Sequence, residues 1–200
     1  IRGNNLLRNV TFSASAFLLG GAAIDAYEVL FIKNALDLGP KGYAFVVSLS
    51  GASFLIGGFV NVFISKWFDS RSLFVYGTIL AVFANIMYSF SVNIYLVTIS
   101  LILTGIGVTA HNTTATTILQ TNIPKHLQGR VTSFQSTFPD LSSTVSVLIA
   151  GIFVPYTPIR IIVIVAALIT SLALLPLFSI ADKEKISFKK KSHSAQVGEK

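Results

Sequence analysis

The sequence contains no cysteine and few charged residues, and each shortage excludes a class of protein. Without cysteine the chain can form no disulfide scaffold and no thiolate metal site. Charged residues make up only 12% of the 200 positions, whereas hydrophobic residues make up 52%. The mean hydropathy of +0.73 is far too high for a soluble domain of this length. The composition therefore predicts a protein that is embedded in a lipid bilayer.

Catalytic signatures are also missing. The sequence contains no His-Glu-x-x-His motif, no nucleophile elbow and no glycine-rich phosphate loop. We therefore expect no enzyme activity, no cofactor, no metal and no nucleotide-driven pump. The net charge of +7 would suggest a nucleic-acid partner in a soluble protein, but here the basic residues lie between and after apolar segments. That placement indicates membrane topology, so we expect no nucleic acid to bind.

Six apolar stretches are long enough to cross a bilayer, because a helix that spans about 30 Å of hydrocarbon needs about 20 residues. They cover residues 9–32, 43–64, 72–91, 94–119, 131–153 and 159–180. Short connections rich in turn residues make consecutive helices antiparallel neighbours. We predict an all-α membrane protein with a lead-in at 1–8, a six-helix transmembrane bundle at 9–181 and a basic tail at 182–200. The chain begins with Ile1 and shows no signal peptide, so we expect a fragment of a longer protein.

The basic residues are distributed unequally between the two sides of the predicted bundle. Of the 15 Lys and Arg residues, all except Lys33, Lys41 and Arg160 fall on the side that holds both ends of the chain. The positive-inside rule places that side, and both termini, in the cytoplasm. We expect a multi-pass protein of a plasma membrane, such as the bacterial inner membrane.

The stretch 104–139 concentrates polar residues inside the apolar sequence. The fourth predicted span becomes polar between Gly107 and Thr117, and the fifth begins polar again after a short basic loop. Within this stretch, His111 and Thr114 share a helix face with Gly107. Polar groups are expensive in hydrocarbon unless they face protein or water. We therefore predict that His111 and Thr114 line an aqueous path in which the imidazole relays protons or binds substrate. The alternative is that neighbouring hydroxyls satisfy the imidazole.

Two carboxylates share one face of the first predicted span, because Asp25 and Glu28 are three residues apart. Two acidic groups this close repel each other, which favours proton binding by one of them. We predict that the two form a proton-coupling pair on the substrate path or a vestibule that attracts cations. Glu28 has a simpler alternative role as an interfacial residue that pairs with Lys33 or Arg160.

A third carboxylate, Asp140, lies near the middle of the fifth predicted span. A charged carboxylate at the bilayer centre costs about 2.5–3.5 kcal/mol, so it must face protein or water. Pro139 beside it removes a backbone donor, as in broken helices that line cavities. We predict proton or substrate coupling for Asp140. The alternative is a structural hydrogen bond with Ser136 or Ser143, one turn away.

Several loops resemble those of the major facilitator superfamily. Segments 119–124 (Leu-Gln-Thr-Asn-Ile-Pro) and 129–131 (Gly-Arg-Val) resemble its loop between helices ten and eleven. Segment 38–43 (Leu-Gly-Pro-Lys-Gly-Tyr) is similar to its outer turn before helix eight, and segment 65–71 (Ser-Lys-Trp-Phe-Asp-Ser-Arg) resembles its signature between helices eight and nine. The branch that looks closest contains macrolide efflux proteins and the enterobactin exporter. The resemblance implies the C-terminal six-helix half of such a transporter, with the N-terminal six-helix half as its partner.

This resemblance implies a secondary active transporter in which a proton, or another coupling ion, drives efflux of a small amphipathic compound of the drug, macrolide or siderophore type. It also implies a cytoplasmic gate at Asp69, Arg71 and Arg130, with plain membrane anchoring as the alternative for Arg130. Small residues recur every seven positions from Ala44 to Ser65, and this face either contacts the partner half or packs within the bundle. Two other functions stay open: a non-transporting membrane fragment or assembly partner, and a lipid flippase on the same scaffold.

Overall fold

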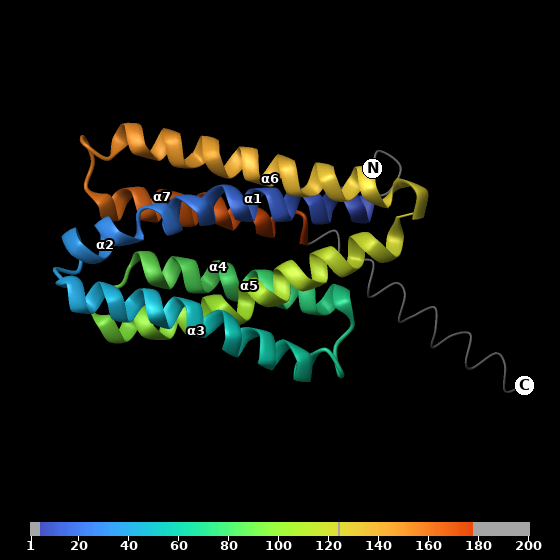
Figure 1. Ribbon diagram of the computed structural model, residues 1–200, viewed down its shortest axis with the longest axis horizontal. Coiled ribbons are helices and arrows are strands. Elements are labelled where there is room, and N and C mark those ends of the chain that lie inside the picture. Colours follow the sequence, from blue (N-terminus) through green and yellow to red (C-terminus); the bar gives the residue numbers. More distant parts are fainter. Residues whose placement is uncertain (1–4, 124, 178–200) are drawn as a thin grey trace, which may run out of the picture.

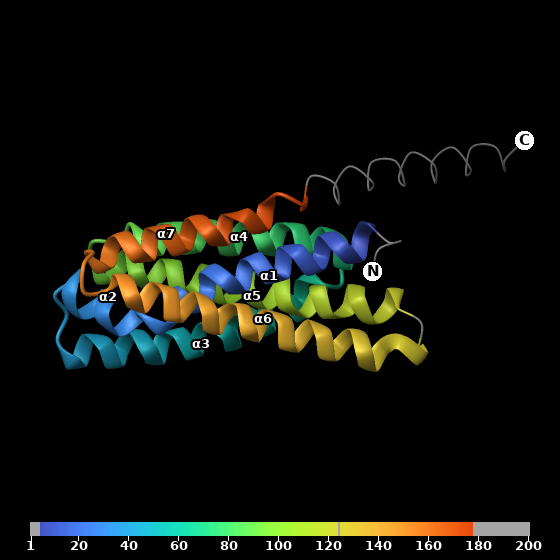
Figure 2. The same ribbon diagram turned by 90° about the horizontal axis from the view of Figure 1, so that it is seen from above.

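The computed structural model describes residues 5–123 and 125–177, and every regular element within these ranges is a helix. The helices lie side by side along the long axis of the molecule (Figures 1 and 2). The predicted all-α class is therefore confirmed for the described residues. In chain order the helices are α1 (Asn5–Ala26), α2 (Glu28–Asn34), α3 (Pro40–Ile64), α4 (Ser70–Ser89), α5 (Ile94–Asn122), α6 (Lys125–Phe153), α7 (Ile159–Ser171) and the short 3-10 helix η1 (Leu172–Leu174).

Three helices begin where the sequence provides a start signal. Pro40 opens α3, where the missing backbone N–H has no intrahelical partner to lose. Asp69 caps α4, because its carboxylate accepts a hydrogen bond from the Arg71 amide at 3.1 Å. Asn93 caps α5 in the same way, by accepting a bond from the Leu96 amide at 2.9 Å. These starts keep the connections short and set neighbouring helices antiparallel.

The helices pack as two groups of three. α1 packs against α6 and α7, whereas α5 packs against α3 and α4 (Figure 1). Contacts between α1 and α5, and between α4 and α7, join the two groups. The central helices α1 and α5 therefore each lie between several neighbours, and α5 carries the buried site positions His111 and Thr114.

The first helix is interrupted, although the sequence predicts one continuous span over residues 9–32. α1 ends at Ala26 and α2 begins at Glu28, with Tyr27 between them at φ −105° and ψ 11°. The Tyr27 hydroxyl donates a hydrogen bond to the backbone carbonyl of Val147 in α6 at 2.8 Å. The two residues are 120 positions apart, so this contact could not be predicted from local periodicity.

Four helices, α1, α3, α4 and α5, are long and apolar enough to cross a membrane. Two further apolar helical segments, Ser143–Phe153 and Ile159–Leu174, are shorter than that among the described residues. The chain is a multi-pass membrane protein by this measure, but the predicted number of six spans is not established. α6 itself is 29 residues long (Lys125–Phe153), but many of its side chains before Ser143 lie outside the described part of the structure.

α3 approaches α5 most closely at Gly57. A Cβ atom built on Gly57 would collide with the backbone of Gly105, and one built on Gly105 would collide with Ser53. Small residues at such a crossing let two helix backbones touch. The neighbouring Gly58, by contrast, has open space where a Cβ atom would be.

Replacing Gly57 by alanine should destabilise the protein, because the new methyl group forces α3 away from α5. We expect a loss of about 1–3 kcal/mol, as is typical for overpacking a tight contact. The thermal unfolding midpoint of the detergent-solubilised protein measures this loss. Gly58→Ala is the matched control and should leave the midpoint unchanged; equal midpoints for the two variants would contradict the close contact.

Candidate functional site

His111 of α5 lies in the packed interior, where only 1% of its surface is exposed. Its Nδ1 lies 2.7 Å from the hydroxyl of Thr78 in α4, and that hydroxyl donates to the backbone carbonyl of Phe74 at 2.7 Å. Because the hydroxyl proton of Thr78 is already used, Nδ1 must be the donor to Thr78. The Nε2 atom has no hydrogen-bond partner among the described residues. The Thr78 contact thus holds the imidazole in one orientation and leaves Nε2 unused.

Aromatic rings and neighbouring helices enclose this imidazole. The rings of Phe17 and Phe74 stack against it with centroid distances of 4.7 and 4.8 Å. Thr114, also buried, donates its hydroxyl to a backbone carbonyl one turn earlier in its own helix. Gly107 lies directly against α4. The helix face that the sequence assigns to an aqueous path is therefore packed against α1 and α4, and the Thr78 hydroxyl satisfies Nδ1 of His111.

Asp25 and Glu28 lie on either side of the helix break at Tyr27. The Asp25 side chain is exposed and that of Glu28 is half-buried. Their charges are close enough to interact. Neither carboxylate has an ion-pair partner within the part of the chain that the structure describes. Broken helices at membrane depth commonly present charged or polar groups to ions and substrates.

Arg160, one of the predicted partners of Glu28, is occupied elsewhere. Its guanidinium donates to the backbone carbonyl of Ser91 at 2.8 Å and to that of Ala35 at 3.1 Å. It also lies 5.4 Å from the ring centroid of Phe31. These contacts tie the ends of α2 and α4 to the start of α7. Unpaired carbonyls at helix ends satisfy the guanidinium, and no ion pair joins it to Glu28 among the described residues.

Asp140 lies on α6 with an exposed side chain. Ser143 and Thr144 donate their hydroxyls to its backbone carbonyl at 2.8 and 2.9 Å. The hydroxyl of Ser143 therefore binds the backbone of Asp140 and not its carboxylate. The side chains of Pro139 and Ser136 lie outside the described part of the structure.

The structure places Asp25 and Asp140 on neighbouring helices and separates both from His111. α1 and α6 pack together and run in the same direction (Figure 1). Because Tyr27 contacts Val147, a rise of 1.5 Å per residue puts Asp25 and Asp140 about 8 Å apart along the helix axis. Both side chains are exposed, whereas His111 is enclosed. The carboxylates, and not the imidazole, are therefore open to whatever faces this half of the bundle.

Among the predicted gate residues, Asp69 acts as a helix cap. Its carboxylate accepts hydrogen bonds from the Arg71 amide at 3.1 Å and from the Ser72 hydroxyl at 2.6 Å. Partial burial raises the pKa of Asp69, but these hydrogen bonds outweigh that effect and lower the pKa below its ordinary value. The Arg130 side chain lies outside the described residues, so a latch between Asp69 and Arg130 stays a prediction.

The cap at Asp69 should stabilise the protein in a pH-dependent way. Asp69→Ala removes the cap and should cost about 1 kcal/mol at neutral pH. Asp69→Asn keeps a capping oxygen and isolates the contribution of the charge. Because the folded pKa is lowered, that contribution is present above the unfolded pKa of about 3.9 and disappears as the pH falls through the folded value. Thermal midpoints of wild type and Asp69→Asn should therefore converge in acid; a constant difference would contradict this assignment.

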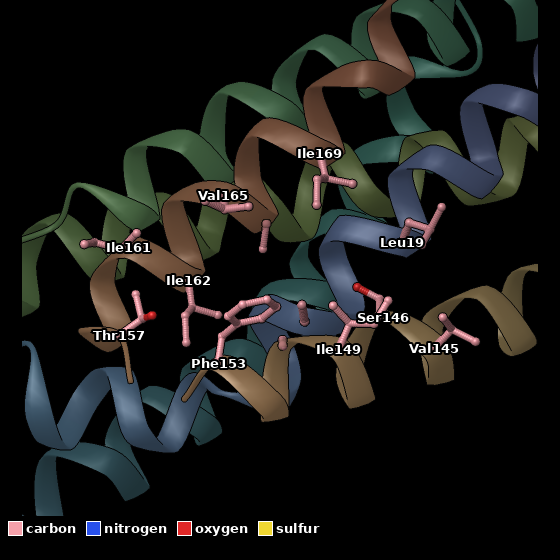
Figure 3. A pocket seen from close by; sticks show the side chains of 13 residues that line it. Leu19, Val145, Ser146, Ile149, Phe153, Thr157, Ile161, Ile162, Val165 and Ile169 are labelled. Atoms are coloured by element: carbon pink, nitrogen blue, oxygen red, sulfur yellow. The ribbon is translucent and has the colours of Figure 1, made fainter. Parts of the chain in front are cut away.

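An apolar cavity of about 390 Å³ lies between α1, α6 and α7 (Figure 3). Phe153 projects toward α7 from the end of α6, and Ile162 and Val165 face it from α7. Thr157 and Ser146 contribute hydroxyls, and no charged side chain lines the cavity. A second cavity, of about 420 Å³, lies between α3, α4 and α5. Both volumes fall in the range of roughly 300–1,000 Å³ that is typical of small-molecule sites.

Sequence reasoning missed the roles of three residues that join the helices of this region: Tyr27, Thr78 and Arg160. A signal existed only for Arg160, which lies at the first turn of a helix, where a cation opposes the helix dipole and needs compensation. Tyr27 and Thr78 act on residues far away in the sequence, so no local pattern marks them. Among the described residues, His, Asp and Glu side chains form no group that could hold a metal ion.

Comparison with known protein families gives a match that covers almost the whole chain. A family model described as Major Facilitator Superfamily matches residues 10–198, which include most of α1 and all the later helices of the described structure. A comparison with curated proteins gave no match.

Proposed function

The chain belongs to the major facilitator superfamily, a superfamily of secondary transporters, and from this premise we propose that it is the C-terminal six-helix half of a proton-coupled exporter. The exported compound is small and amphipathic, of the drug, macrolide or siderophore type. The protein resides in a plasma membrane with both ends of this segment in the cytoplasm. The following observations support the proposal.

The packing of the helices supports an internal repeat. If α1 with α2, α3 and α4 form a first unit, then α5, α6 and α7 form a second one in the same order. The leading helix of each unit packs against the two trailing helices of the other unit: α1 against α6 and α7, and α5 against α3 and α4. Nested three-helix repeats of this kind are the building plan of each six-helix half in this superfamily.

The outward faces support a missing partner half. α3 is exposed over most of its length, with Leu55 and Phe59 each about 70% exposed. Gly51 and Gly58 on the same helix have open space where a side chain would be. A face of small residues lets another helix approach closely. We therefore assign this face to contact with the N-terminal half.

The single observation that carries the transport mechanism is the pair of exposed carboxylates, Asp25 and Asp140, on adjoining helices. Charged groups at membrane depth are expensive unless they face water or a partner. Each carboxylate can become neutral by binding a proton, which removes that cost and changes the preferred surroundings of α1 and α6. Proton binding and substrate release can then alternate at the interface between the two halves.

Reconstitution of the full-length protein in liposomes tests this proposal. An imposed pH gradient should drive a compound of the drug or siderophore type against its own concentration gradient, and a protonophore should abolish the movement. Protein-free liposomes provide the background. Movement that ignores the pH gradient would argue for another coupling ion, and movement of fluorescent lipid between leaflets without any drug movement would favour a flippase.

A further inference from the structure

The connection that lines one end of the cavity between α3, α4 and α5 carries two cations. Phe68, which lines the cavity, belongs to the connection between α3 and α4. Lys66 and Arg71 lie on either side of Phe68 in the sequence; Lys66 is exposed and Arg71 is half-buried. Asp69 lies between the two cations, but its carboxylate is turned to the Arg71 amide and the Ser72 hydroxyl. The ammonium group of Lys66 lies 5.5 Å from the ring centroid of Phe63, and neither cation forms an ion pair among the described residues.

The shape of this cavity suits a flexible chain. α5 packs against both α3 and α4, but α3 and α4 have at most marginal contact with each other, so the cavity is a wedge between two diverging helices. Its lining follows α4 from Leu73 to Leu80, a length of about 10 Å at 1.5 Å per residue. The wedge thus runs parallel to the helices, as the acyl chains of a bilayer do. No charged side chain lines it.

An empty wedge would leave its mostly apolar lining atoms without contacts, and Asn61 and Tyr76 are the only polar side chains among its described lining residues that water could meet. In a membrane the available apolar material is the acyl chain of a lipid. Trp67, in the same connection, is 80% exposed, as is typical of an aromatic residue at the boundary between lipid and water. The mouth of the wedge therefore lies at the depth of lipid headgroups.

We propose that this wedge binds an anionic phospholipid, with one acyl chain between α3 and α4 and the phosphate at Lys66 and Arg71. Basic groups next to gaps between transmembrane helices attract anionic headgroups on the cytoplasmic side of membranes. The site is separate from the Asp25 and Asp140 carboxylates and does not depend on the transport mechanism.

The cavity between α1, α6 and α7 provides an internal comparison. This cavity, which is drawn in Figure 3, also lies between one central helix and two outer helices, and its volume is similar. Arg160, near its Thr157 end, is already bound to the carbonyls of Ala35 and Ser91. Without an available cation this second cavity should show no preference for anionic lipid.

Trp67 is the only tryptophan in these 200 residues and serves as a native reporter. The full-length protein is placed in phosphatidylcholine nanodiscs that contain a small fraction of lipid with brominated acyl chains, which quench nearby tryptophan. The Trp67 signal is the difference between wild type and Trp67→Phe. Brominated phosphatidylglycerol should quench this signal more strongly than the same fraction of brominated phosphatidylcholine.

Each cation should contribute about fivefold to the preference for the anionic lipid, since a Lys or Arg near the surface attracts anionic lipid by about 1 kcal/mol. Lys66→Gln and Arg71→Gln should each lower the preference by about that factor. Lys41→Gln, at the opposite end of the bundle, is the control for charge and should leave it unchanged. Equal quenching by the two lipids, or a preference that survives the double variant Lys66→Gln/Arg71→Gln, would overturn the proposal.

A second pair of variants tests whether an acyl chain occupies the wedge. Leu80→Phe narrows it and should reduce quenching by brominated phosphatidylglycerol. Val165→Phe makes a comparable change in the other cavity and should not alter the Trp67 signal. Unchanged quenching in Leu80→Phe would overturn the placement of the chain. Relief of the quenching by a transported compound, at concentrations that saturate transport, would make the wedge a substrate site and would also overturn the proposal.

Discussion

Replacing Asp140 by asparagine should reduce pH-driven transport to the level of protein-free liposomes, and Asp25→Asn should do the same. Asparagine preserves the size and polarity of each side chain but binds no proton. Both side chains are exposed, so we expect the folded state to change by no more than about 0.5 kcal/mol. Counterflow of labelled compound without a pH gradient should continue, because that exchange needs no net proton movement. Uptake driven by a pH gradient, measured beside counterflow, separates loss of coupling from loss of transport.

Asp37→Asn is the matched control for these two variants. Asp37 is an exposed carboxylate in the connection after α2, and its φ of 51° is one that asparagine also adopts readily. Its charge is removed as in the other two variants, but outside the interface of α1 with α6. We expect unchanged pH-driven transport. If Asp140→Asn and Asp25→Asn both behave like Asp37→Asn, the carboxylate mechanism is wrong, although the membership of the superfamily is unaffected.

The largest loss of stability should come from replacing Arg160 by leucine. The variant leaves the carbonyls of Ala35 and Ser91 without their charged donor and releases the ends of α2 and α4. A hydrogen bond to a charged group contributes about 1.5–3 kcal/mol. Because the guanidinium is only partly buried, we expect a total loss near the low end, of about 2–3 kcal/mol. The thermal midpoint of the detergent-solubilised protein should fall accordingly.

Two further substitutions make this prediction specific to the guanidinium. Arg160→Lys keeps the charge but lacks the planar fork that reaches two carbonyls at once, so it should recover only part of the loss. Lys33→Gln removes an exposed cation from the same end of the bundle and should leave the midpoint unchanged. If Arg160→Lys matches wild type, charge alone accounts for the role of this residue.

Composition and apolar length predict much of the fold. Both depend on local sequence, and the described helices follow the six predicted stretches with most ends displaced by a few residues. The break at Tyr27 escapes such reasoning because its hydrogen bond is with a distant helix. Four helices are long and apolar enough to cross a membrane among the described residues, so the predicted number of six spans stays a prediction.

The candidate site could be predicted only in part. Helical spacing places His111 and Thr114 on one face, and they do share it, but spacing cannot tell whether that face meets water or another helix. The short residues of α4 decide this: Gly77 and Thr78 allow α4 to lie directly on α5. The exposed positions of Asp25 and Asp140 agree with a role in transport, which stays a prediction until the asparagine variants are measured.

The contacts of Arg160 also affect the electrostatic surface at its end of the bundle. The guanidinium lies among carbonyl dipoles and beside the ring of Phe31, and it is only partly buried. Lys33 and Lys41, the other two cations predicted for this side of the membrane, are exposed. Because carbonyl dipoles offset part of the guanidinium charge, we expect the positive potential at this end to come mainly from the two lysines.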